Sequence, residues 1–166
     1  MLVNNAGRAL IKPAIVITWD YWDAVVDVNL KGAYFLACRL ARHCIDHKRP
    51  GAIVNIASTH GLTGLAGRTV YGISKGGMIQ MARMLAIEWA GQGIRVNAVA
   101  LSTVITESRQ EMLKDPEVRE RMLGRIPSGR FPEAGEIAAA VRYLVSADAV
   151  SVTGHTLVVD GGLTAA

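Results

Sequence analysis

Four short, mainly apolar segments alternate with longer helical stretches along this chain of 166 residues. The apolar segments are residues 2–4, 52–57, 94–100 and 156–160. Between these segments, helices are expected at residues 18–47, 69–90 and 133–146, and a polar, helix-rich segment is expected at residues 107–124. Strands buried on both faces read as apolar runs, and parallel strands are joined by crossover helices. The pattern predicts the α/β class, with a doubly wound parallel sheet covered by helices on both faces.

Local signals place several helix ends. Thr18 is expected to cap the first helix, and an irregularity is expected near Asn29 and Gly32. Asp115 followed by Pro116 reads as a cap and a proline at the first helical position. An apolar stripe with helical period runs along residues 69–90, formed by Met78, Met81, Ala82, Leu85 and Trp89.

Composition indicates one globular domain over residues 1–166, because 51% of the residues are hydrophobic. The longest uncharged stretch, 50–67, holds four glycines and several polar residues, so no membrane helix is expected. No secretion signal is expected, because no charged segment followed by an apolar one is found at the first residues. Cys38 and Cys44 face different directions of one predicted helix, so we expect reduced thiols and a cytoplasmic protein. The cations behind the net charge of +4 are scattered, so no nucleic-acid partner is expected.

Three polar residues suit proton transfer to or from an oxygen. Tyr71 and Lys75 are spaced i to i+4 and are therefore neighbours on one helix face. Ser58 follows a predicted strand, where its hydroxyl can point at the same place. A phenol, an ammonium and a hydroxyl together suit general acid–base chemistry on a carbonyl or an alcohol.

Six motifs in this order resemble the short-chain dehydrogenase/reductase family. They are Asn4-Asn5-Ala6-Gly7, Val28-Asn29, Ser58, Tyr71-x-x-x-Lys75, Ile94-Arg-Val-Asn97 and Val159-Asp-Gly-Gly162, and they cover essentially the whole chain. The resemblance implies a Rossmann-like fold, NAD or NADP as cofactor, and a catalytic tetrad of Asn29, Ser58, Tyr71 and Lys75. No metal site is expected.

The resemblance also implies roles for these residues. Tyr71 is the acid or base, Ser58 steadies the substrate oxygen, and Asn29 holds a water that relays protons from Lys75. A cation about 5 Å from a phenolate stabilises it by roughly 3 kcal/mol at an effective dielectric of about 20. The same interaction lowers the pKa of the phenol by roughly two units, so Lys75 is expected to bring Tyr71 towards working pH.

Further residues are expected to hold the cofactor. By resemblance, Lys75 also holds its ribose, and Tyr71 lies beside it. Asn5, Ala6 and Gly7 are expected to line its adenosine side, and Val104 and Thr106 to touch the nicotinamide carboxamide. The sequence does not show whether NAD or NADP is preferred, because the deciding residue follows a strand that this chain lacks.

Two features depart from the family pattern. Leu101-Ser102 stands where the family usually has Pro-Gly, so an impaired nicotinamide contact is expected. The chain begins at what resembles the fourth strand, without the glycine-rich phosphate-binding turn; at about 30 residues per βαβ unit, roughly 80 residues are absent. The missing strands would neighbour residues 2–4, so the fold expected is the C-terminal two-thirds of the domain with an uncovered sheet edge. We therefore expect weak or no dinucleotide binding by these 166 residues, which a calorimetric titration checks.

The substrate is expected to be a small alcohol or ketone, with a preference for a sugar, a sugar acid or a polyol. A 3-oxoacyl carrier-protein reductase is the alternative enzyme, and a non-catalytic truncated fragment is the alternative of another class.

Five arginines in residues 103–130 could clamp a carboxylate or phosphate, although surface ion pairs are the favoured interpretation: Arg109, Arg119, Arg121, Arg125 and Arg130. The family resemblance implies a homodimer or homotetramer, formed by the methionine-bearing helix and the helix at residues 30–45.

Overall fold

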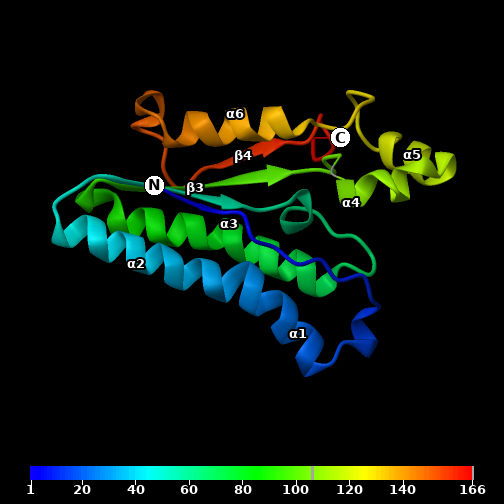
Figure 1. Ribbon diagram of the computed structural model, residues 1–166, viewed down its shortest axis with the longest axis horizontal. Coiled ribbons are helices and arrows are strands. Elements are labelled where there is room, and N and C mark those ends of the chain that lie inside the picture. Colours follow the sequence, from blue (N-terminus) through cyan, green and yellow to red (C-terminus); the bar gives the residue numbers. More distant parts are fainter. Residues whose placement is uncertain (106, 166) are drawn as a thin grey trace.

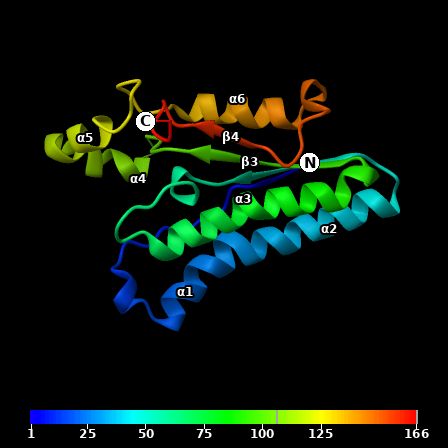
Figure 2. The ribbon, with the colours of Figure 1, turned by 180° about the vertical axis from the view of Figure 1, so that it is seen from behind.

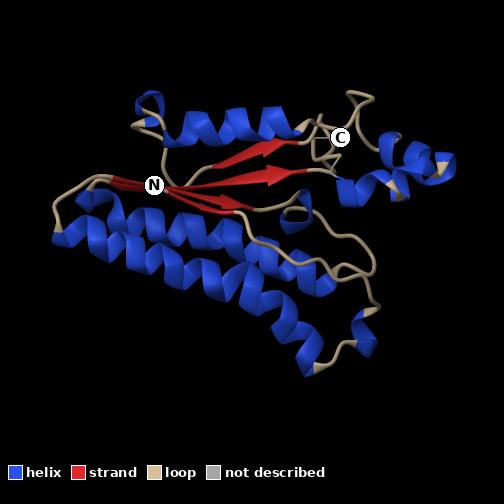
Figure 3. Ribbon diagram, in the orientation of Figure 1, coloured by secondary structure: helices blue, strands red, loops and turns tan. Residues whose placement is uncertain are grey.

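The computed structural model describes residues 1–105 and 107–165, which contain a parallel sheet of four strands in the order β1-β2-β3-β4 (Figure 3). The strands are β1 (Leu2–Asn4), β2 (Gly51–Ile56), β3 (Ile94–Leu101) and β4 (Thr156–Val159). Every predicted strand is present, and its ends lie within one residue of the predicted ends. The α/β prediction with a parallel sheet is confirmed. β1 lies at one edge of the described sheet and β4 at the other.

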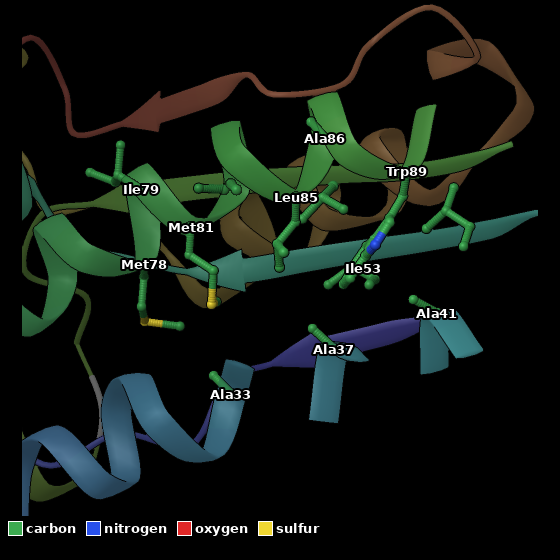
Figure 4. Close-up of a cluster of buried hydrophobic side chains, with 14 of the residues drawn as sticks. Ala33, Ala37, Ala41, Ile53, Met78, Ile79, Met81, Leu85, Ala86 and Trp89 are labelled. Carbon is green, nitrogen blue, oxygen red and sulfur yellow. The ribbon is translucent and has the colours of Figure 1, made fainter. Parts of the chain in front are cut away.

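Helices cover both faces of the sheet (Figures 1 and 2). α2 (Gly32–Asp46) and α3 (Thr69–Trp89) lie on one face, and α6 (Ala134–Val145) lies on the other. Every fourth residue of α2 from Ala33 to Ala41 is a buried alanine, and this row lies along α3 from Met78 and Met81 to Trp89 (Figure 4). Small residues on α2 allow it to approach α3 and the sheet closely, and the residues between them form the largest of the three described apolar clusters.

The long helical run before β2 is interrupted where the sequence predicted. α1 (Trp19–Val26) begins after Thr18, whose hydroxyl accepts a 3.3 Å hydrogen bond from the Tyr21 backbone N–H. A π-helical turn at Asp27–Lys31 then separates α1 from α2. In this turn the Gly32 N–H donates to the carbonyl of Asp27, five residues earlier. The turn contains Asn29, which it directs into the interior.

A small helical lobe follows β3 at the carboxyl end of the sheet (Figure 1). It contains α4 (Glu107–Gln110) and α5 (Pro116–Leu123). The Asp115 side chain accepts hydrogen bonds from the first N–H groups of α5, as its position before Pro116 predicts. Leu113, Ile126 and Phe131 form a separate buried cluster beneath the lobe. The lobe therefore has a core of its own beside the end of the sheet.

Two of the sequence motifs hold β4 and α6 in place. Arg95 donates to the carbonyls of Leu144 and Ser146 at the end of α6, at 2.6 and 3.1 Å. Buried Asp160 accepts hydrogen bonds from the backbone N–H groups of Gly162 and Thr164 at 2.9 and 2.8 Å. The first set of contacts satisfies backbone carbonyls at the carboxyl end of α6, and the second satisfies backbone N–H groups just after β4. Among the described residues, no helix combines the length and apolar character that crossing a bilayer requires.

Candidate active site

Ser58 and Tyr71 line one cavity of about 450 Å³ at the carboxyl end of the sheet. Ser58 follows β2 and begins the short helical turn η3 (Thr59–Gly61), where its Oγ accepts a 3.2 Å hydrogen bond from the His60 N–H. Tyr71 lies in the first turn of α3, half-buried, with its ring 6.1 Å from that of His60. The strand end and the helix start thus direct a hydroxyl and a phenol into the same space.

Lys75 lies one helical turn beyond Tyr71 and is buried. Its Nζ donates a 2.6 Å hydrogen bond to the carbonyl of Ile56 and lies 5.9 Å from the centre of the Tyr71 ring. Burial disfavours the charged amine and lowers the pKa of Lys75 from its ordinary value to about 8. The predicted neighbours Tyr71 and Lys75 therefore meet, with the amine beneath the phenol ring.

Glycines allow η3 to contact α3 through the backbone. A Cβ added to Gly61 would lie 2.7 Å from the carbonyl carbon of Lys75. A Cβ added to Gly72 would lie 2.9 Å from the carbonyl oxygen of His60. Both distances are too short for a side chain, so only glycine fits at these two positions. This close approach brings Ser58 to the first turns of α3.

Asn29 connects the segment after β1 to α3. The side chain is fully buried; its Oδ1 accepts a 2.6 Å hydrogen bond from the Arg8 N–H, and its Nδ2 donates to the Arg8 carbonyl at 3.0 Å. Nδ2 also lies 3.0 Å from the hydroxyl of Ser74, which itself donates to the carbonyl of Tyr71 at 2.7 Å. Asn29 thus holds the backbone next to the catalytic candidates through its side chain. Its predicted water-holding role stays a prediction.

The residues predicted to hold a cofactor lie at the same edge of the sheet. Asn5, Ala6 and Gly7 follow β1 and are exposed. A Cβ on Gly7 would lie 3.5 Å from Lys75 Nζ, so this glycine keeps the space above the amine open. Val104 follows β3 and is half-buried, and Thr106 lies outside the described residues. Open parallel sheets bind nucleotides beyond the carboxyl ends of their strands, so the residues present fit part of a dinucleotide, whereas the glycine-rich turn that holds the pyrophosphate in this kind of fold is not among them.

The sequence analysis missed three residues that line the cavity: His60, Arg68 and Ser102. Arg68 precedes α3, only three residues before Tyr71, and Ser102 follows β3. Proximity to Ser58 and Tyr71 in sequence was the one available signal for His60 and Arg68. Ser102 was noted only as a departure from the family pattern.

The structure places the five arginines of residues 103–130 in different environments. Arg130 forms an exposed, two-pronged ion pair with Glu136 at 2.7 and 2.8 Å, as the surface ion-pair interpretation predicts. Arg109, Arg121 and Arg125 line the cavity and take part in none of the ion pairs found among the described residues. Arg119 is exposed on α5 and is not among the residues that line the cavity.

The arrangement can exchange a proton with an oxygen atom in the cavity. Ser58 can donate its own proton, since its Oγ accepts from His60. The Tyr71 phenol can act as acid or base, with a cationic amine nearby to stabilise negative charge on its oxygen.

Comparison with known proteins identifies several relatives of this chain. A family model described as enoyl-(acyl carrier protein) reductase matches residues 1–164. The 3beta-hydroxysteroid dehydrogenase 1 of Eggerthella lenta is 40% identical over 163 residues, which are 98% of this chain and 62% of that protein. A 3-oxoacyl-[acyl-carrier-protein] reductase of Thermotoga maritima is 40% identical over 166 residues, 98% of this chain and 65% of that protein. The chain thus spans less than two thirds of the length of these curated relatives.

Solved structures share the fold. A gluconate 5-dehydrogenase from Burkholderia cenocepacia, in complex with NADP and tartrate, matches with a TM-score of 0.93 and 33% identity, over 99% of this chain and 65% of that one. A 4-hydroxyisoleucine dehydrogenase complexed with NADH matches with a TM-score of 0.97 and 31% identity, over 99% and 68%.

Proposed function

Because the chain belongs to the short-chain dehydrogenase/reductase family, we propose that it interconverts an alcohol and a ketone with NAD or NADP. The observation that supports this function is the shared cavity of Ser58 and Tyr71 with the buried amine of Lys75 behind it. A hydroxyl, a phenol and an ammonium at one cavity are the groups that proton transfer to a carbonyl oxygen needs.

Each side chain has a defined part in the proposed reaction. When bound, the nicotinamide supplies or accepts the hydride at carbon. In the reducing direction Tyr71 gives its phenolic proton to the substrate oxygen, and in the oxidising direction it takes that proton back. Ser58 donates a hydrogen bond to the same oxygen. Lys75 stabilises the negative charge that develops on the phenol oxygen when its proton leaves.

We propose that Asn5, Ala6, Gly7, Val104 and Thr106 hold the cofactor together with Lys75. Support comes from the exposed segment after β1 and from the space over Lys75 that Gly7 leaves open. The related structures named above contain NADP or NADH, which favours a nicotinamide dinucleotide here. Asn29 positions this segment through its hydrogen bonds to Arg8.

For the substrate, we propose a sugar, sugar acid or polyol. The likeness to a gluconate 5-dehydrogenase structure and the arginines of the cavity support this class. The second candidate is reduction of a 3-oxoacyl carrier protein, which is favoured by the relative from Thermotoga maritima. A cytoplasmic location is proposed from the unpaired Cys38 and Cys44.

The proposed function is tested with a version of the protein that adds the family's strands and glycine-rich phosphate-binding turn before β1, using NAD(H) or NADP(H) and a panel of sugar acids, polyols and acetoacetyl thioesters. We expect this version to turn over sugar acids or polyols, and Tyr71→Phe to lower its kcat/KM roughly 10³-fold. Tyr143→Phe, which changes an exposed phenol on α6, is the matched control and should match the wild type. Turnover of the thioesters alone would favour the second candidate, and no turnover at all would favour a non-catalytic protein.

We also propose a homodimer or homotetramer that forms through α2 and α3. The outer faces of these two helices expose large apolar side chains, among them Tyr34, Phe35, Ile73, Met84 and Ile87. An apolar groove between the helices lies on the same side and is lined by Leu30, Phe35, Met81 and Met84. Contiguous exposed apolar surface on a folded protein marks an interaction site.

A further inference from the structure

The cavity that Ser58 and Tyr71 line is strongly basic on its remaining walls. Four arginines line it: Arg68, Arg109, Arg121 and Arg125. No aspartate or glutamate is found among the described residues that line it. Arg68 and Arg109 are half-buried, whereas Arg121 and Arg125 are exposed. The basic residues thus come from the start of α3 and from the lobe after β3, which face one another across the space.

These charges act on each other and on the residue between them. Burial lowers the pKa of His60, and Arg68, Arg125 and Arg109 lower it further, so the ring stays neutral over a wider pH range. Burial and the charge of Arg109 likewise lower the pKa of Arg68. Like charges at a partly buried site repel one another unless a counter-charge is present. The ion pairs found among residues 1–105 and 107–165 involve none of these four arginines.

Two polar groups in the same cavity wall have no partner. In the described part of the chain, Ser102 Oγ and His60 Nδ1 are buried and make no hydrogen bond. Ser102 has only 7% of its surface exposed, and both residues line the cavity. A buried polar atom without a partner costs free energy, so these two atoms make the wall beside the arginines less stable.

From the four arginines and the lack of an acidic residue among the described residues of the lining, we propose that the substrate is a hydroxy acid or oxo acid whose carboxylate is bound by Arg68 and Arg109. The inference rests on the proposed function, because it places the reacting oxygen at Ser58 and Tyr71 and the anionic group between the start of α3 and the lobe after β3. Arginine is suited to this part, since its planar guanidinium binds an oxyanion with two parallel hydrogen bonds. Arg121 and Arg125 extend the positive field to the mouth of the cavity, where it attracts anions.

Binding is measured calorimetrically with the purified protein at low salt, so that the result does not depend on hydride transfer. The ligands are lactate, tartrate and gluconate, each compared with the neutral polyol of the same chain length. We expect at least one acid to bind tenfold or more tightly than its polyol. Arg68→Gln and Arg109→Gln should each weaken that binding about tenfold and weaken polyol binding by a much smaller factor.

Arg130→Gln is the matched control, because it removes the same charge from an exposed ion pair with Glu136 that does not line the cavity. It should keep the affinity for the acid. Acids that bind no better than polyols, or equal losses in Arg130→Gln and Arg109→Gln, would overturn the inference. Hydride transfer is recorded in parallel: turnover of polyols without acid binding would overturn the inference alone, whereas acid binding without any turnover would count against the proposed function.

Discussion

The amine of Lys75 donates a 2.6 Å hydrogen bond to the backbone carbonyl of Ile56, the last residue of β2. Ser58 lies only two residues beyond that carbonyl, and Tyr71 lies one helical turn before the amine. The bond therefore connects the strand that delivers the hydroxyl to the helix that delivers the phenol. It also explains how a buried amine is tolerated here, because one of its donors is satisfied by the backbone.

The buried amine makes stability depend on pH. The pKa of Lys75 falls to about 8 in the folded protein, so between pH 8 and its ordinary value of 10.5 the unfolded chain binds more protons. The free energy of unfolding should rise with pH across this window, by about 3 kcal/mol from this residue. Lys75→Met should remove the rise. Urea unfolding followed by tryptophan fluorescence, at several pH values from 7.5 to 10.5, measures the difference between the two proteins.

The control for this experiment is Lys114→Met, which removes an exposed ammonium paired with Glu111. It should follow the wild type at every pH, because an exposed surface pair contributes little to stability. A difference between wild type and Lys75→Met that stays constant with pH would contradict the prediction.

The contact between η3 and α3 should not tolerate a methyl group. Gly61→Ala places a Cβ 2.7 Å from the Lys75 carbonyl carbon, so the backbone must shift and carry Ser58 with it. We expect a loss of about 2 kcal/mol in unfolding free energy together with a lower kcat. Gly64→Ala is the matched control, because nothing lies within 4 Å of its added Cβ. Equal stability of the two variants would show that the close approach is not required.

The side chain of Asn29 should matter for cofactor binding as well as for stability. Asn29→Ala leaves the Arg8 N–H and carbonyl without their partner, and we expect a loss of about 2 kcal/mol. The freed segment after β1 should raise KM for the dinucleotide more than KM for the substrate. Ser74→Ala removes only one contact of the Asn29 amide and should have the smaller effect on both quantities. A larger rise in KM for the substrate would contradict the assigned role.

The sequence predicted the parts of this fold that depend on local patterns. Strand ends were predicted to within one residue because buried parallel strands form apolar runs, and Thr18 and Asp115 were recognised as caps because capping uses adjacent residues. The sequence also predicted that Ser58 and Tyr71 lie close together, because one follows a recognisable strand and the other lies on a recognisable helix. Residues joined only by tertiary folding were not predicted. Arg68 and Arg109 line one cavity although 41 positions separate them in the sequence (109 − 68).

The irregular helix, too, was predicted only in those features that depend on adjacent residues. An interruption near Asn29 and Gly32 was predicted, and the π-turn at Asp27–Lys31 confirms it. The partners of the Asn29 side chain were not predicted, because Arg8 and Ser74 reach it from distant parts of the chain. From the sequence, Leu101-Ser102 was interpreted only as the loss of the family's Pro-Gly. The structure shows that Ser102 is buried and is one of the residues that line the cavity.

The apolar outer face of α2 and α3 leads to the last prediction, on assembly. Phe35 is 59% exposed on α2 and Ile87 is 86% exposed on α3, and both belong to the group of large exposed apolar side chains on these two helices. A symmetric interface would contain each residue twice, so Phe35→Glu or Ile87→Glu introduces two buried carboxylates per dimer. We expect either variant to shift the protein from dimer or tetramer to monomer in light scattering. Ile15→Glu changes an equally apolar, 95% exposed residue before α1 and should leave the assembly unchanged. A wild-type protein that is monomeric at micromolar concentration would show that this face serves another purpose.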